Sequence, residues 1–385
     1  MLAVFFVYKI TGYMKKIIIL LAIFMGLGSL NLTYSQGCVE ASSDDGVQVV
    51  GYIQPQFDYY FFGEDSKGNA IKPNTFYFKR ARIGVVGNIP YDISYYVMAE
   101  LSPVAGGPQL LDAFVTYSPF GKMVKFSMGQ FKSPFSLELN TPCQALHTIR
   151  RSTVVNEMAA PFRELGFMVL GSFGKERDII SYRLAVLNGT GINNVLSATN
   201  YDDNKSKDIA GRVVVSPLEG IKIGGSYRHG LVEKIDIDGD SKSKTSWAVD
   251  LTLEKYNFLV QGEYINGKYI GDIAGGGGCG GKDADGTYPE YKKNGFWVMA
   301  LYKFNFGLQP VVKYETYDPD GSAYKYLNQT QVITQNTMTF GFNYFINEWT
   351  RVQLNYAYNS EGKNADGSVG EYKNDALMFQ VQVKF

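Results

Sequence analysis

The sequence predicts an all-β fold, a 16-stranded antiparallel transmembrane β-barrel, and three observations support this prediction. The chain is 15% aromatic and contains 42 glycines, but only 19% of its residues are charged, below the roughly 25% usual for soluble domains. Apolar and polar residues alternate along many segments, which is typical of strands with one face in lipid and one in water. Short turns also alternate with longer connections, as in a barrel.

The N-terminus has the features of an export signal. Lys15 and Lys16 precede an apolar stretch that ends in small and polar residues near Ser35, the usual order in a signal peptide. We therefore expect residues 14–35 to be a signal peptide and residues 1–13 an artefact of an upstream start codon. Residues 36–385 would form the barrel. A lipoprotein anchored through Cys38 is an alternative.

Loss of the leader changes the charge balance. Without Lys9, Lys15 and Lys16, the 37 basic residues become 34, against 37 acidic ones, so the net charge is −3. A nucleic-acid partner is not expected at this charge.

Sixteen segments have strand character. In order they are 47–62, 74–87, 92–102, 109–118, 123–132, 165–174, 179–188, 207–216, 221–230, 244–255, 258–265, 295–303, 308–318, 335–345, 350–359 and 375–385. Seven tight turns alternate strictly with eight longer loops between them. This order predicts an even number of strands with both termini on the periplasmic side.

The last strand shows the alternation most clearly. Its predicted outward residues are Leu377, Phe379, Val381, Val383 and Phe385, and its inward residues are Ala376, Met378, Gln380, Gln382 and Lys384. A chain that ends on phenylalanine in such a strand is typical of barrels in the outer membrane of Gram-negative bacteria. We expect that location, with membrane lipid and lipopolysaccharide as surroundings.

Two predicted loops are unusual. Residues 133–164 form a long connection after the fifth strand, with a short apolar run and three arginines, Arg150, Arg151 and Arg163. Residues 266–294 contain the glycine run 275–278, which has no packing use in a strand and suggests a lid or spacer.

Aromatic residues near strand ends, together with Trp247, Trp297 and Trp349, favour the interfacial girdles of a membrane barrel. The few aromatic residues expected to face inward are Tyr52, Tyr60 and Tyr96. A stacking surface for sugars inside the barrel is the alternative use.

The remaining chemistry-bearing residues predict neither a metal site nor a cofactor. Cys38, Cys143 and Cys279 lack zinc spacing, and they are either single loop cysteines or include one Cys143–Cys279 bridge. Four late loops carry Asp-x-Asp-Gly or Asn-x-Asp-Gly, which are ordinary turn formers or, alternatively, weak calcium ligands. His229 is expected on the outer face without a partner serine, so no enzyme activity is expected.

Several segments together resemble a known family. FYFKRARIGVVG (76–87), MGQFKSPFS (128–136), Arg-Arg-Ser at 150–152 followed by PFRELG (161–166), and the terminal strand are similar to the porin O and P family of phosphate- and polyphosphate-selective outer-membrane porins. The resemblance implies a homotrimer, an arginine ladder on one wall of the pore, and an inward-folded third extracellular loop that narrows it. The third loop here is 133–164.

Strand parity places a set of cations inside the barrel. The inward set is Arg80, Arg82, Lys125, Arg183, Arg212, Lys222 and Arg228. A guanidinium keeps its charge and binds phosphate oxygens in pairs, which suits an anion path. Carboxylates are also predicted inside, among them Glu100, Asp112, Asp208 and Asp250, so ordinary ion pairing is the alternative.

The sequence therefore predicts an outer-membrane diffusion porin for small anionic solutes, with Arg150, Arg151 and Arg163 adding charge on the constriction loop. Phosphate or polyphosphate is the solute that the resemblance implies. Two alternatives stay open, a general non-selective porin and a plugged barrel that acts as an adhesin or receptor.

Overall fold

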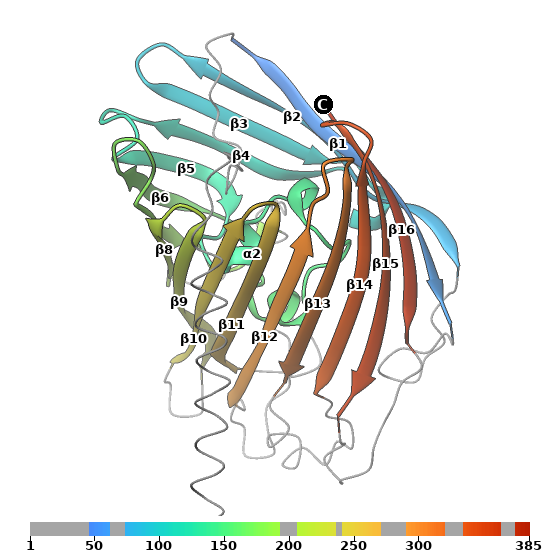
Figure 1. Ribbon diagram of the computed structural model, residues 1–385. Coiled ribbons are helices and arrows are strands. Elements are labelled where there is room, and N and C mark those ends of the chain that lie inside the picture. Colours follow the sequence, from blue (N-terminus) through green and yellow to red (C-terminus); the bar gives the residue numbers. More distant parts are fainter. Residues whose placement is uncertain are drawn as a thin grey trace, which may run out of the picture. The chain divides into compact units, whose positions relative to one another are not determined.

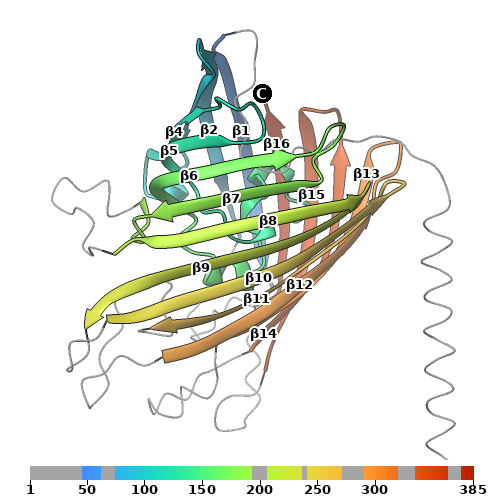
Figure 2. The ribbon, with the colours of Figure 1, turned by 90° about the vertical axis from the view of Figure 1, so that its left-hand side faces the viewer.

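The computed structural model describes residues 46–61, 74–192, 206–235, 241–270, 290–319, 334–362 and 374–385, all within one compact unit, Gln36–Phe385. Sixteen antiparallel strands form a closed barrel, in which each strand pairs with its sequence neighbours and β1 pairs with β16. Figure 1 and Figure 2 show the ring from two sides. The predicted fold class is confirmed.

Every predicted strand is present. The first eight are β1 (Gln48–Tyr60), β2 (Thr75–Ile89), β3 (Ile93–Glu100), β4 (Gln109–Tyr117), β5 (Lys125–Lys132), β6 (Arg163–Phe173), β7 (Ile180–Leu187) and β8 (Asp208–Leu218). The others are β9 (Ile221–Ile235), β10 (Ser241–Lys255), β11 (Phe258–Ile270), β12 (Glu290–Tyr302), β13 (Leu308–Asp318), β14 (Gln335–Phe345), β15 (Thr350–Glu361) and β16 (Ala376–Lys384). A short 3-10 helix, η1 (Pro103–Ala105), lies between β3 and β4.

The short connections are tight turns, as predicted. Between β10 and β11, Tyr256 and Asn257 both have positive φ, 50° and 66°, the conformation in which a two-residue turn matches the twist of its strands. The prediction of one loop over 266–294 is wrong at both ends, because 266–270 belong to β11 and 290–294 to β12. Most of these residues are polar, so the lipid-facing apolar signal stops before the hydrogen-bonded ladder does.

The two faces of the strands differ as the alternation predicts. On β16, Phe379 and Val383 are exposed on the outside, whereas Gln380 and Gln382 are buried inside. The other strands repeat this pattern, so large apolar side chains cover the outer face of the barrel. The hydrocarbon core of a membrane requires such an apolar outer face. The closed ladder of strands also pairs the backbone N–H and C=O groups, which lipid cannot hydrogen bond.

The tryptophans correct one prediction. Trp247 and Trp349 are 41% and 53% exposed, as an interfacial girdle requires, but Trp297 is only 2% exposed. Its indole Nε1 donates a hydrogen bond of 3.1 Å to Glu263. Trp297 therefore lies on the inner face. Successive residues of β12 point to opposite sides of the barrel wall, and Trp297 occupies an inward position.

Several predictions concern residues outside those described. These are the signal peptide and start artefact within 1–45, the glycine run 275–278, Cys38 and Cys279, and the glycines of the four acidic turns. Within the described part of the chain, no helix is both long enough and apolar enough to span a bilayer.

Candidate solute pathway

The connection between β5 and β6 lies inside the ring of strands, as Figure 1 shows for α2. We call residues 133–162 the inner segment; it contains α2 (Leu137–Asn140), η2 (Cys143–Ala145) and α3 (Thr153–Met158). Its apolar side chains pack on inward residues of β11 and β12, among them Ile265 and Trp297. The apolar run noted in the sequence therefore covers part of the inner wall.

A buried carboxylate fixes the start of α2. Glu263 on β11 accepts hydrogen bonds from the Ser136 hydroxyl at 3.0 Å and from the backbone N–H groups of Leu137 and Glu138 at 2.7 and 3.2 Å. The first N–H groups of a helix have no partner within the helix. Glu263 supplies those partners from the barrel wall.

Further contacts fix the middle of the inner segment to β13. The Lys313 ammonium lies 2.7 Å from a Glu138 oxygen and 3.4 Å from a Glu315 oxygen. Glu315 also accepts a 2.9 Å hydrogen bond from the backbone N–H of Thr153. Lys313 is 1% exposed, so the ion pairs replace the water that a buried charge would lose.

Neutral amides attach the segment to the strands nearest the barrel seam. The backbone N–H of Ile149 donates to Asn355, and Gln382 donates to the carbonyl of Gln144. His147 is hydrogen bonded to Gln309 at 3.2 Å. Burial, together with the charge of Arg351, lowers the pKa of His147 to about 4, so its imidazole is neutral at neutral pH.

The open space lies on the other side of the inner segment. A cavity of about 330 Å³ is lined by β2 to β7 and the turns between them, and a smaller one of about 40 Å³ lies between η2 and strands β1 to β6. A passage through the barrel would follow this wall.

Three of the predicted arginines are paired with carboxylates. Arg82 lies 2.7 Å from Glu100, and it also donates to the Tyr52 hydroxyl. Arg212 pairs with Asp250, and Arg228 pairs with both Asp208 and Glu164. For these residues the alternative of ordinary ion pairing holds.

Two predicted arginines bind neutral groups instead. Arg80 donates to the amide oxygen of Gln54 at 2.9 Å, and Arg183 donates to Asn140 of α2 at 3.2 Å. Among the described residues, neither forms an ion pair. Their charge is therefore not cancelled by a contacting carboxylate.

Arg351 on β15 is a further inward cation that was not included in the predicted path. It is 3% exposed and donates to the Gln382 amide oxygen at 3.0 Å, while its Nε has no partner in the described structure. Gln54 also donates to Gln382, at 2.7 Å. Hydrogen bonds thus run from Arg80 through two glutamines to Arg351. The inward parity of Arg351 was the signal that could have found it.

The two predicted lysines also lie on the inner face. Lys125 and Arg183 line the larger cavity. Lys222 is opposite Thr252 in the β9–β10 ladder and interacts with Glu254.

The arginines predicted on the loop differ in their surroundings. Arg150 pairs with Asp58 at 2.8 Å on β1. Arg151 remains within the segment and donates to the carbonyls of Glu138 and Thr141. The placement of Arg163 on the loop is wrong, because it is the first residue of β6, where its ladder with Lys132 begins. It holds Asp112 through two hydrogen bonds of 2.9 and 3.0 Å.

Cys143 lies buried at the centre of these cations. Its sulfur accepts hydrogen bonds of 3.4 Å from Arg82 and Arg151. Burial alone would raise the pKa of the thiol. The charges of Arg151, Arg80 and the neighbouring cations outweigh burial and lower this pKa to well below its usual range. Two guanidinium groups, from the wall and from the inner segment, therefore meet at this sulfur.

Solved structures with a similar fold include porins and an outer-membrane channel. An anion-selective porin from Comamonas acidovorans shares 12% identity over 88% of this chain and 99% of its own, with a TM-score of 0.62. The channel DcaP of Acinetobacter baumannii shares 15% identity over 89% and 99%, with a TM-score of 0.64. Salmonella typhi OmpF, in complex with daunomycin, shares 15% identity over 89% and 99%, with a TM-score of 0.60.

Fold and family match together define the class of the protein, which is an outer-membrane porin. Residues 49–233, from β1 into β9, match the family described as phosphate-selective porin O and P. This match confirms the resemblance stated from the sequence, and it indicates a channel rather than an enzyme. No curated protein matched the chain.

Proposed function

We propose that this porin passes small hydrophilic anions by diffusion, with phosphate or polyphosphate as the solute class. The observation that carries the proposal is the pair Arg80 and Arg351, each bonded to a glutamine oxygen and joined through Gln54 and Gln382. Guanidinium groups without a contacting carboxylate attract anions into a narrow passage and repel cations.

The proposed anion path uses only some of the cations predicted from the sequence. Arg82, Arg212 and Arg228 support the wall through ion pairs with Glu100, Asp250 and Asp208, so they contribute less net field. Arg80, Arg183 and Arg351 supply the selectivity, with Arg151 on the inner segment. Lys125 and Lys222 extend the positive wall. Arg150 attaches the inner segment to β1 through Asp58, and Arg163 joins β6 to β4 through Asp112.

The surroundings follow from the same proposal. The protein would act as a homotrimer in the outer membrane of a Gram-negative bacterium, and its apolar outer face would contact lipid, with lipopolysaccharide near the loops. The inner segment would act as the constriction of each pore.

The reversal potential of the purified protein in a planar bilayer, under a potassium chloride gradient, tests the proposal. We expect the wild type to favour chloride and phosphate to reduce the conductance. Arg80→Gln combined with Arg351→Gln should lower the chloride-to-potassium permeability ratio severalfold. Arg177→Gln is the control, because Arg177 is exposed on the β6–β7 turn and donates only to the Pro217 carbonyl among the described groups.

An unchanged ratio in the double variant would show that these arginines do not set the selectivity. The general non-selective porin would then be favoured, and the carboxylate pairs of Arg82, Arg212 and Arg228 already support it. The plugged barrel has its own support, since the inner segment is hydrogen bonded to side chains on both sides of the lumen, from Arg183 to Asn355. A complete lack of conductance by the folded protein would favour the plug.

A further inference from the structure

Part of the inner wall is apolar, which a water-filled pore does not require. Phe114, Phe131, Met168 and Leu170 lie on β4, β5 and β6 and line the larger cavity. Phe131 is fully buried, and its ring packs edge-on against Phe114 with 6.3 Å between the centroids. Interiors of porin barrels are generally polar. These side chains therefore call for a separate explanation.

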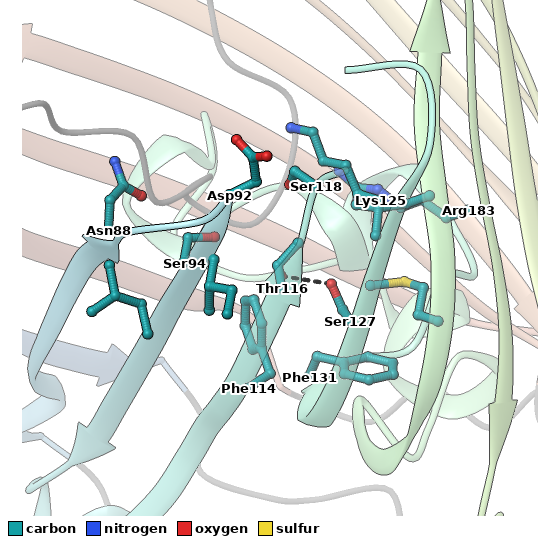
Figure 3. A pocket seen from close by; sticks show the side chains of 14 residues that line it. Asn88, Asp92, Ser94, Phe114, Thr116, Ser118, Lys125, Ser127, Phe131 and Arg183 are labelled. Atoms are coloured by element: carbon teal, nitrogen blue, oxygen red, sulfur yellow. Dashed lines mark hydrogen bonds between the residues drawn. The ribbon is translucent and has the colours of Figure 1, made fainter. Parts of the chain in front are cut away.

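Polar and charged groups complete the same cavity. Figure 3 shows Lys125 and Arg183 on one side and Phe114 and Phe131 on another. Thr116 and Ser127 form a hydroxyl pair 2.7 Å apart between these two sides. The cavity thus offers an apolar surface and two cations to one occupant.

The size and position of the cavity suit a small solute in transit. Its volume of about 330 Å³ is at the lower end of the roughly 300–1,000 Å³ usual for small-molecule sites. Arg183 connects it to Asn140 of α2, and Asp92 and Ser118 place its other end at the short turns. A solute that passes the inner segment along this wall would reach the cavity next.

The charge of the lining selects among anions. Lys125 and Arg183 carry two positive charges, and Asp92 at the turn carries one negative charge. A phosphate dianion is also attracted, but beside the apolar lining it would lose more hydration free energy than a monoanion would. The apolar lining adds binding free energy only for a solute that carries an apolar group, since transfer of apolar surface out of water is favourable.

We propose that this cavity is a binding site for organic monoanions that join one carboxylate to a ring-sized apolar body. The apolar body would lie on Phe114, Met168 and Leu170, and the carboxylate would lie toward Lys125 and Arg183. The inference extends the proposed function, because it adds amphipathic carboxylates to the inorganic anions that the arginines favour.

Block of the single-channel current in a planar bilayer measures this site directly. The probes are benzoate, acetate as the anion without a ring, benzyl alcohol as the ring without a charge, and phosphate. For the wild type we expect half-block by benzoate at a concentration at least tenfold below that of acetate, with little block by benzyl alcohol. Benzoate that blocks no better than acetate would overturn the proposal.

Two variants separate the apolar and the charged parts. Phe114→Ala should raise the half-blocking concentration of benzoate at least fivefold while leaving that of acetate and phosphate nearly unchanged. Val115→Ala is the matched control, because Val115 is the next residue of β4 and is 50% exposed on the outer face. Arg183→Gln should weaken the block by benzoate and acetate alike, with Arg177→Gln as its control. Equal effects of Phe114→Ala and Val115→Ala would contradict the site.

A second measurement keeps the test independent of conduction. Titration calorimetry of benzoate into the detergent-folded wild type and Phe114→Ala proteins should give a dissociation constant at least fivefold weaker for the variant. For both proteins, folding is first established by a gel mobility of the unheated sample that differs from that of the heated sample. The proposed anion selectivity is tested separately, and it fails if the reversal potential does not favour chloride. Benzoate binding can be present or absent whether or not the channel favours chloride.

Discussion

Arg212 and Asp250 form a buried ion pair on the inner wall that carries no net charge. Two hydrogen bonds join them, with Nη1–Oδ2 at 2.5 Å and Nη2–Oδ1 at 3.0 Å, and their side chains are 7% and 2% exposed. Ser226 accepts a further bond from the same guanidinium. The pair shows how a lumen cation can be structural, because its partner cancels its field.

Removal of that partner should therefore change selectivity. In Asp250→Asn the Arg212 guanidinium remains without its carboxylate, so the chloride-to-potassium permeability ratio should rise, as measured by the reversal potential. The barrel should also lose stability, since breaking a buried pair costs about 3–5 kcal/mol. Asp178→Asn is the control, because the Lys122–Asp178 pair is exposed on the surface and such pairs contribute little. An Asp250→Asn channel with wild-type selectivity would exclude this local account.

Single-residue geometry could be predicted only in part. Strand parity places a side chain inside or outside from its own strand alone, and it placed Arg80, Arg82 and Arg228 correctly. The partner of each cation depends on distant segments, as when Arg228 reaches Glu164, which is 64 positions away. The parity of one strand carries no information about such contacts.

The inner segment is the element on which the pathway depends. Its helices have four and six residues, too short to be stable alone in water. They are held by buried groups of the wall, with Glu263 at the start of α2 and Lys313 between Glu138 and Glu315. The conformation of the segment is thus imposed by the barrel.

Lys313→Met should loosen this attachment. Without the ammonium, Glu138 and Glu315 would repel each other, so the segment should move more, and the single-channel current should become noisier with a changed mean conductance. Current recordings at fixed voltage measure both quantities. Lys268→Met removes a comparable but exposed pair with Glu290 and should leave the recordings unchanged. Currents as quiet as those of the wild type in Lys313→Met would mean that the remaining contacts, among them those of Glu263, hold the segment without the ammonium.

At this scale the sequence predicts strands better than it predicts their ends. Inside the membrane, lipid demands an apolar residue at every second position, and this period locates the strand. The β11–β12 ladder continues through 266–270 and 290–294, where most side chains are polar and this period is absent. The inner segment has no period at all, because its shape follows from contacts with many strands.

The whole molecule is defined by closure of the barrel between its first and last strands. Gly51 and Phe385 exchange two backbone hydrogen bonds, of 2.8 and 3.0 Å, next to the β1–β16 ladder. Closure removes the exposed strand edges that lipid would not tolerate. The alternation and the order of turns and loops both reflect this requirement, so the fold is the most predictable property of the chain.

The close approach at Gly51 makes closure sensitive to a single side chain. A Cβ at this position would lie 2.5 Å from the Arg82 carbonyl oxygen and 2.7 Å from the Phe385 ring. Gly51→Val should therefore displace β1 from both of its neighbours and reduce the yield of closed barrel. The measurement is gel migration before and after heating, since a closed barrel resists detergent until it is heated.

Gly225→Ala provides the control for this effect. Gly225 also lies within a strand, but a Cβ there would meet nothing within 4 Å, so its heat-dependent migration should match the wild type. Loss of the closed form in both variants would mean that any side chain at a strand glycine disturbs assembly. Loss in Gly51→Val alone would locate the requirement at the seam, where the first strand must fit between Arg82 and the last residue of the chain.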